Sequence, residues 1–297
     1  MTSAVRLGIN PLTWSNDDLP SLGAENSLES CLREARVAGY AGVELGNKFP
    51  REPAALRAAL EPHGLALVSG WYSARLLERD ADAEFAAMRA HLDLLAALGS
   101  DVMVVAEVTH CVHGDRHARQ SRRPFVPAGQ WPRFGEQLTR LAELMQRQGM
   151  RLAYHHHMGT VVQSADDVDR LMQSSGEAVG LLLDTGHLRF ADADPVAVAT
   201  RHARRVVHVH CKDVRPEVLA DVRNRDTSFL DAVLAGVFTV PGDGAVDYDA
   251  VLAPLAAAGY RGWLVVEAEQ DPAIAHPMTY ATLGHRHLSA VAARHFT

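Results

Sequence analysis

Residues 255–269 read "LAAAGYRGWLVVEAE" and contain the pattern that decides the fold of this 297-residue chain. An alanine-rich stretch ends at Gly259, and an apolar run follows that ends in Glu267 and Glu269. Glycine ends helices because it accepts the left-handed conformation of a C-terminal cap. A short, continuous apolar run is typical of a strand buried on both faces of a parallel sheet. The stretch therefore predicts a helix that leads directly into a buried parallel strand.

The same alternation recurs along the whole chain. Eight apolar runs predict strands at residues 5–10, 42–46, 65–71, 101–107, 151–157, 179–184, 206–213 and 263–269. Helical patterns accompany them at residues 27–39, 52–64, 82–99, 131–149, 164–176, 194–205, 247–260 and 275–295. Other glycines are expected to end helices as Gly259 does, namely Gly39, Gly64, Gly99 and Gly149. Asn26 is the expected N-cap of the first helix. Eight strand–helix units predict an α/β fold, a single (β/α)8 TIM barrel domain over residues 1–297.

Two long segments interrupt the alternation. Residues 108–130 and 214–246 each follow a predicted strand. The loops that follow strands in such barrels lie at the C-terminal face, where barrel enzymes have their active sites. Long loops at this face are more often lids or substrate walls than plain surface. We therefore expect both segments to border the site.

The composition is that of an ordinary globular protein, with 47% hydrophobic and 22% charged residues and a formal net charge of −7. An acidic surface repels phosphate backbones, so nucleic acid is not the expected partner. No apolar run approaches the roughly 20 residues of a membrane helix, and the N-terminus shows no signal-peptide pattern. Three cysteines without paired spacing fit a reducing compartment. We expect a cytoplasmic protein that acts on a small molecule, with a homo-oligomer as one open alternative.

Nearly every predicted strand ends in titratable side chains. The set comprises Glu44, Glu107, His155, His156, His157, Asp184, His187, His208, His210, Lys212, Glu267 and Glu269. Burying so many ionisable groups together is costly unless something pairs them. A divalent metal ion is the simplest partner, because Asp, Glu and neutral His are its usual ligands. The pattern predicts a metal site at the C-terminal mouth of the barrel.

The strand that ends in three histidines illustrates both the prediction and its alternatives. Alternate side chains of a strand face the barrel axis, so His155 and His157 are expected to point inward and His156 toward the helices. Taken singly, such residues have structural explanations: Asp184 could cap a helix, and Glu267 could pair with an arginine. The coincidence of these residue types on neighbouring strands favours the metal site.

Several motifs resemble those of the inosose dehydratases, which belong to the xylose-isomerase-like TIM barrels. They are "GINPLTWSNDDLP" (8–20), "GVELGNKFP" (42–50), "YHHHMGT" (154–160), "LLLDTGH" (181–187), "VPGDGAVDY" (240–248) and "GWLVVEAEQDP" (262–272). The matches spread over nearly the whole chain. The resemblance implies dehydration of 2-keto-myo-inositol (scyllo-inosose) to a trihydroxycyclohexane-1,2-dione in inositol catabolism, with Mn²⁺ or Co²⁺ as the cofactor.

The resemblance also implies a ligand set. Members of the wider superfamily hold the metal with Glu, Asp, His and Glu from late strands. Asp184, His210 and Glu267 match three of these positions. The fifth strand ends in histidine rather than glutamate, so His155 would take the place of the first Glu. His157, Glu269 and water are alternatives for this fourth ligand.

Dehydration of a β-hydroxy ketone requires a base for the proton next to the carbonyl and an acid for the departing hydroxide. Lys212 and His187 are the preferred catalytic candidates, with Glu44 and His157 as rivals, and acid and base are not assigned separately. A lysine beside a cation can have its pKa lowered enough to act as a base. A salt bridge between Lys212 and Asp213 is the structural alternative.

A cyclitol substrate presents hydroxyl groups and flat ring faces, so its pocket should combine polar and aromatic residues. The expected substrate-binding residues are Trp14, Asn16, Asp17, Asp18, Asn47, Lys48, Trp71, Glu107 and Glu269.

Other functions on the same scaffold remain as alternatives. A metal-dependent sugar isomerase or epimerase would also use Asp184, His210 and Glu267, but it would favour glutamate over histidine in the fifth strand. An endonuclease of this superfamily would need a basic groove, and the only basic cluster in the sequence that favours one is "RHARQSRRP" (116–124). A non-catalytic carbohydrate-binding barrel would keep the pocket without a metal.

Overall fold

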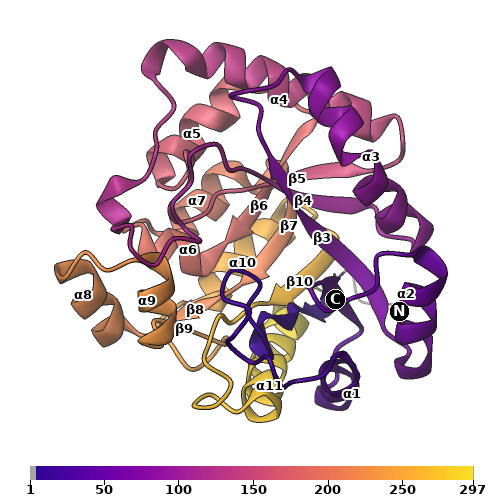
Figure 1. The fold of residues 1–297 in the computed structure, drawn as a ribbon. Coiled ribbons are helices and arrows are strands. Elements are labelled where there is room, and N and C mark those ends of the chain that lie inside the picture. The colour runs from indigo at the N-terminus through magenta and orange to yellow at the C-terminus, as the bar shows by residue number, and fades with distance from the viewer. Residues whose placement is uncertain (1–4, 297) are drawn as a thin grey trace.

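Eight parallel strands close a barrel in the computed structural model, which describes residues 5–296 (Figure 1). The barrel strands are β1 (Val5–Ile9), β2 (Gly42–Leu45), β3 (Ala66–Ala74), β4 (Val102–Glu107), β5 (Arg151–His155), β6 (Val179–Asp184), β7 (Val206–Cys211) and β10 (Gly262–Val266). Pairing of β1 with β10, from Val5↔Gly262 to Ile9↔Val266, closes the ring. The predicted (β/α)8 TIM barrel is confirmed. Residues 1–4 and 297 of the predicted domain lie outside the described residues.

Helices surround the barrel (Figure 1). The α-helices are α1 (Leu28–Ala38), α2 (Pro53–Leu60), α3 (Ala81–Ala97), α4 (Trp131–Gln146), α5 (Ala165–Ser174), α6 (Thr185–Phe190), α7 (Pro195–His202), α8 (Pro216–Asn224), α9 (Phe229–Leu234), α10 (Tyr248–Ala257) and α11 (Pro277–His295). Short 3₁₀ helices lie at Pro11–Thr13, Glu61–His63, Gln120–Arg122, Ala128–Gln130 and Ala203–Arg205. Within the described part of the chain, no helix is long and apolar enough to cross a membrane.

Helix caps explain where the outer helices begin and end. The five glycines predicted to end helices all have positive φ, for example Gly39 at 107° and Gly259 at 78°. The prediction of Asn26 as the N-cap of α1 is wrong. Ser27 occupies that position, and its side chain accepts the backbone N–H of Ser30, while the Asn26 amide donates to a backbone carbonyl group in the β1–α1 loop.

Five barrel strands end earlier than the sequence predicts, β1 and β2 by one residue and the other three by two or three residues. Strand β5 ends at His155, β7 at Cys211 and β10 at Val266. The chain turns directly after β5, where the His157 carbonyl accepts the backbone N–H of Thr160. The positions of His157, Glu267 and Glu269 are therefore set by the loops that follow β5 and β10, not by the alternation of side chains along a strand.

Apolar side chains fill the barrel below its C-terminal mouth. One buried cluster comprises Val102, Val104, Ala153 and Leu182, and a second comprises Val68, Trp263 and Val265. Ala153 lies two residues before His155, and Leu182 lies two residues before Asp184. Because side chains alternate along a strand, the titratable groups form the next inward layer above this apolar filling.

The long segment after β7 folds into structure of its own. It contains α8, α9 and a two-stranded antiparallel sheet of β8 (Asp213–Val214) and β9 (Phe238–Thr239), which project from one side of the barrel (Figure 1). Phe229 and Phe238 anchor it in a separate hydrophobic cluster with Phe190 and Met158. The segment forms the side wall behind the histidines that follow β5 and β6.

Candidate active site

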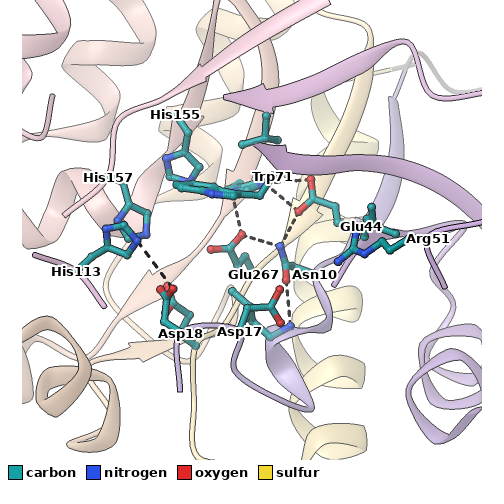
Figure 2. A pocket seen from close by; sticks show the side chains of 15 residues that line it. Asn10, Asp17, Asp18, Glu44, Arg51, Trp71, His113, His155, His157 and Glu267 are labelled. Atoms are coloured by element: carbon teal, nitrogen blue, oxygen red, sulfur yellow. Dashed lines mark hydrogen bonds and ion pairs between the residues drawn. The ribbon is translucent and has the colours of Figure 1, made fainter. Parts of the chain in front are cut away.

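A cavity of about 210 Å³ opens at the C-terminal ends of the strands. It is lined by Asn10, Leu12, Asp17, Asp18, Glu44, Leu45, Arg51, Trp71, Val104, His113, His155, His157, His210, Glu267 and Glu269. Figure 2 shows the histidines His155, His157 and His113 on one side and Glu44 with Arg51 on the other. The volume is below the roughly 300–1,000 Å³ of pockets for drug-sized ligands, and it suits a substrate of one small ring.

The four residues expected to bind a metal come together at the floor of this cavity. The distance from His155 Nε2 to Asp184 Oδ2 is 3.7 Å, and His210 Nδ1 lies 3.6 Å from the same oxygen. His210 Nδ1 lies 2.8 Å from Glu267 Oε2. Two atoms that bind one tetrahedral ion at about 2.0–2.2 Å are themselves about 3.3–3.6 Å apart, so most of these spacings fit a shared cation.

An unpartnered carboxylate oxygen marks the place where a cation would fit. Asp184 Oδ1 caps α6 by accepting the backbone N–H of His187 at 2.8 Å. Asp184 Oδ2 is buried and has no hydrogen-bond partner among the residues that the structure describes, although His155 Nε2 and His210 Nδ1 lie within 3.7 Å of it. A buried polar atom without a partner is costly, and an ion bound between these three atoms would satisfy it. The helix-cap role considered for Asp184 is therefore real, but it uses only one of the two oxygens.

His155 has the form that a metal ligand needs. Its Nδ1 lies 2.7 Å from the carbonyl oxygen of His156, so Nδ1 carries the proton and Nε2 presents its lone pair toward Asp184. Burial, together with the nearby His210, lowers the pKa of His155 well below its usual value, which keeps the ring neutral. His156, the middle histidine, is buried, and its Nε2 accepts the backbone N–H of Asp184.

His187 competes with His210 for a place in the ligand set. Donor atoms of His155, Asp184, His187 and Glu267 all lie within 4.8 Å of one another. His187 Nε2, however, lies 3.0 Å from the Lys212 ammonium group, whereas His210 Nδ1 faces two carboxylates. A nitrogen that faces another cation is the poorer ligand, so the geometry favours His210.

Lys212 lies behind the cavity rather than on its wall. Its ammonium group contacts Glu267 Oε1 at 2.5 Å and Glu269 Oε1 at 2.6 Å. Burial disfavours the charged form, but Glu267, Glu269 and Asp184 outweigh it and raise the pKa of Lys212. The three carboxylates thus favour the charged ammonium form, and a lysine pKa lowered by a bound cation stays a prediction. Asp213, considered as its partner, accepts backbone N–H groups instead.

The two glutamates after β10 differ in their pKa. For Glu267, burial raises the pKa, but the charges of His210 and Lys212 prevail and lower it to about 2. For Glu269, burial is the largest effect and raises the pKa to about 7, although Lys212 opposes it. Of the two glutamates, Glu269 is therefore the one that holds a proton more readily.

The four candidates for proton transfer divide into two pairs. Glu44 and His157 line the cavity, whereas Lys212 and His187 are fully buried behind it. His157 Nδ1 lies 2.8 Å from the carbonyl oxygen of Met158, which leaves Nε2 free. Burial and the nearby His113 lower the pKa of His157 well below its usual value, so its ring is neutral.

Some residues expected to bind substrate do not line this cavity. The Trp14 ring is buried, and its Nε1 donates to Glu34 Oε2 at 2.7 Å. The Asn16 side chain accepts the backbone N–H groups of Asp18 and Leu19, so it shapes the β1–α1 loop. These side chains are already used within the protein, which the sequence could not reveal.

Three further expected substrate residues lie elsewhere for similar reasons. The Lys48 ammonium group donates to three backbone carbonyl groups of the β1–α1 loop. The Glu107 carboxylate accepts the backbone N–H groups of Leu76 and Thr109. Asn47 donates its backbone N–H to Asp17 at the cavity edge. Trp71 and Glu269, by contrast, line the cavity, as do Asp17 and Asp18.

His113, Asn10 and Arg51 line the cavity although sequence reasoning did not select them. His113 comes from the loop 108–130, its ring centroid lies 5.0 Å from that of His157, and its Nε2 lies 3.9 Å from Asp18 Oδ1. Its Nδ1 is buried and has no hydrogen-bond partner in the described part of the chain. One histidine among 16 in an irregular loop carries no pattern that could have singled it out.

Comparison with known proteins agrees with this geometry. A family model described as "Xylose isomerase-like TIM barrel" matches residues 32–291. The chain belongs to this family. The family resemblance inferred from the motifs is thereby confirmed.

Curated members of the family resemble the chain over nearly its full length. It is 54% identical to "Rhizopine catabolism protein MocC" of Rhizobium meliloti over 98% of this chain and 89% of that protein. It is 46% identical to "Inosose dehydratase" of Geobacillus thermodenitrificans over 93% of this chain and 94% of that protein.

Solved structures show the same fold at low sequence identity. The IOLI protein with a bound zinc atom has a TM-score of 0.69 at 16% identity and covers 99% of this chain and 100% of its own. The probable 3-DHS dehydratase AsbF of Bacillus anthracis has a TM-score of 0.67 at 12% identity, over 96% of this chain and 99% of its own.

Proposed function

We propose that the chain is a hydro-lyase that dehydrates 2-keto-myo-inositol (scyllo-inosose) to a trihydroxycyclohexane-1,2-dione in inositol catabolism. The observation that carries the proposal is the convergence of His155, Asp184, His210 and Glu267 at the floor of a one-ring cavity. Relatives at 41–46% identity over nearly the full length are named inosose dehydratase, which supports the same reaction.

We infer that these four residues would hold a divalent metal ion, Mn²⁺ or Co²⁺. Two imidazoles and two carboxylates form a donor set that such ions accept. The IOLI protein, which has the same fold, was solved with a zinc atom, and this supports a metal ion in a barrel of this kind. When bound, the ion would act as a Lewis acid that withdraws electron density from the substrate carbonyl group.

Proton transfer falls to the groups that face the cavity. His157 lines the cavity, and because its Nδ1 contacts the Met158 carbonyl oxygen, its Nε2 is the nitrogen placed to remove the proton next to the carbonyl group. Glu269, with a pKa of about 7, is partly protonated near neutral pH and suits the acid that protonates the departing hydroxide. Lys212 and His187, preferred from sequence, would support these groups from behind, since Lys212 contacts both Glu267 and Glu269.

The remaining lining residues fit a polyhydroxylated ring. The Trp71 ring lies 5.5 Å, between centroids, from each of His155 and His157, and it offers a flat surface for a ring face. The Asp18 carboxylate and the His113 ring, whose Nε2 lies 3.9 Å from Asp18 Oδ1, also line the cavity and are suited to bind hydroxyl groups. We propose that this wall determines how the cyclitol lies on the metal.

Incubation of the purified protein with scyllo-inosose tests the proposal. Protein freed of metal with a chelator should be inactive, and added Mn²⁺ or Co²⁺ should produce the dione, followed by its ultraviolet absorbance. Formation of a new inosose isomer instead would identify a metal-dependent epimerase. Turnover that is equal with and without metal would contradict the proposed chemistry.

A further inference from the structure

Glu44, at the end of β2, lines the cavity and contacts both histidines of β7, His208 and His210. It is buried, and polar groups contact both of its oxygens. Oε1 accepts from Ser69 Oγ at 2.5 Å and lies 2.8 Å from His208 Nε2. Oε2 accepts from Asn10 Nδ2 at 2.7 Å. The carboxylate is therefore fixed by neighbours on several strands.

The same carboxylate contacts the outer nitrogen of His210. His210 Nε2 lies 3.2 Å from Glu44 Oε1 and 3.1 Å from Glu44 Oε2. A carboxylate oxygen only accepts hydrogen bonds, so Glu44 binds the Nε2–H side of the imidazole. The other nitrogen, Nδ1, points toward Asp184 Oδ2 and Glu267 Oε2, the two carboxylates proposed to share the ion. Glu44 thus fixes which edge of the His210 ring faces the proposed metal site.

We infer that Glu44 is a positioning residue that holds the His210 imidazole with Nδ1 toward the metal, rather than a group that transfers protons to the substrate. Carboxylates that accept the second N–H of a metal-binding histidine orient the ring and increase its basicity. The contacts of Glu44 with Ser69, His208 and Asn10 leave it little freedom to approach a substrate.

Asn10 extends this arrangement to a second ligand. Its Nδ2 donates to Glu44 Oε2 at 2.7 Å and to Glu267 Oε2 at 3.1 Å (Figure 2). Its Oδ1 accepts the backbone N–H of Leu12, which fixes the orientation of the amide. The Asn10 amide therefore connects Glu44, which contacts His210 Nε2, to Glu267, which contacts His210 Nδ1. Hydrogen bonds to Glu44 on β2 and from Asn10 after β1 thus fix the positions of two proposed ligands, His210 and Glu267.

The test is the affinity of the protein for Mn²⁺, measured by titration without substrate. Glu44→Gln keeps the shape of the side chain but replaces one acceptor oxygen by a donor. We expect Mn²⁺ to bind about 10–100-fold more weakly than to the unaltered protein, the usual effect of losing such a partner. The visible spectrum of the Co²⁺-loaded variant should also change, because the imidazole would no longer be held in one orientation.

Glu84→Gln is the matched control. Glu84 is also a buried carboxylate, but it accepts from the Tyr72 hydroxyl group and the backbone N–H of Arg75 on the outer side of β3. This variant should bind Mn²⁺ as the unaltered protein does. Thermal unfolding without metal checks that both variants are folded, and Ser69→Ala, which removes one contact of Glu44, gives a milder second variant.

The inference rests on the proposed metal site but not on the proposed substrate. Equal Mn²⁺ affinity of Glu44→Gln, Ser69→Ala and the unaltered protein would overturn the role of Glu44. Failure of the unaltered protein to bind Mn²⁺ would overturn both that role and the metal site. Tight Mn²⁺ binding that Glu44→Gln weakens, without dione formation from scyllo-inosose, would support the inference and reject the proposed function.

Discussion

The lower and upper halves of the barrel interior differ in chemistry although the same strands build them. The lower half is mainly apolar, with Ala153 on β5 and Leu182 on β6, and His208 on β7 beside Leu182 is an exception. Two residues further along these strands, His155 and Asp184 begin a layer of titratable groups. Along each of these two strands, consecutive inward-facing residues thus change from side chains that stabilise the fold to side chains that are costly to bury.

The substitution Asp184→Asn is expected to have the largest effect, because it removes a proposed metal ligand from the upper layer. Asp184 Oδ2 is the unpartnered oxygen that faces both His155 and His210. A Lewis acid lowers the activation barrier by several kcal/mol, and each 1.36 kcal/mol changes the rate about tenfold. We expect turnover of scyllo-inosose to fall about 1,000-fold and bound metal to be lost, as measured by rate and metal analysis. A variant that keeps its metal and its turnover would contradict the ligand role.

Lys212→Met tests the charges just behind that layer. The ammonium group lies between Glu267 and Glu269, and all three side chains are buried. Its removal leaves two carboxylates without their closest cation, so we expect the free energy of unfolding to fall by about 3–5 kcal/mol in metal-free protein. Turnover should fall about 10–100-fold. Urea unfolding and steady-state kinetics measure the two effects, and unchanged stability would show that Lys212 is not needed to pair the carboxylates.

His113→Ala tests whether a residue of the cavity wall binds the substrate or takes part in the chemistry. The ring packs against His157, its Nε2 lies 3.9 Å from Asp18 Oδ1, and its Nδ1 is buried without a hydrogen-bond partner among the described residues. Loss of one hydrogen bond to substrate, worth about 0.5–1.5 kcal/mol, should raise KM about 3–10-fold and change kcat less. The reverse result, a fall in kcat at constant KM, would show that His113 takes part in the chemistry.

Leu182→Ala is expected to leave catalysis nearly unchanged. The side chain is fully buried in the apolar half of the barrel. Truncation of a buried leucine removes about 2–5 kcal/mol of stability. Urea unfolding should show this loss, while turnover per folded molecule and Mn²⁺ affinity stay close to the unaltered values. A large loss of metal affinity would mean that the two halves are not separable.

The sequence was sufficient for the barrel because each strand and each helix end carries its own local signal. Gly39 and Gly259 end helices where the pattern placed them, and the "DTGH" motif placed Asp184 at a strand end. These features depend on a few neighbouring residues. The gathering of titratable groups at one mouth followed from parallel strands that all end on the same side.

The sequence was insufficient where long-range contacts decide what a side chain does. Lys48 and Glu107 suited substrate binding by type and position, yet both bind backbone groups of neighbouring loops. His113 lines the cavity because a long loop folds back to it. The sign of the pKa shift at Lys212 depends on three carboxylates brought from other strands. None of these contacts leaves a periodic trace in the sequence.

The most direct test of the account is a crystal structure of the protein soaked with Mn²⁺ and measured for anomalous scattering. We predict one manganese ion at roughly 2.0–2.2 Å from His155 Nε2, Asp184 Oδ2, His210 Nδ1 and a Glu267 oxygen, with Glu44 still in contact with His210 Nε2. Manganese bound elsewhere, or no manganese at the floor of this cavity, would contradict the central claim.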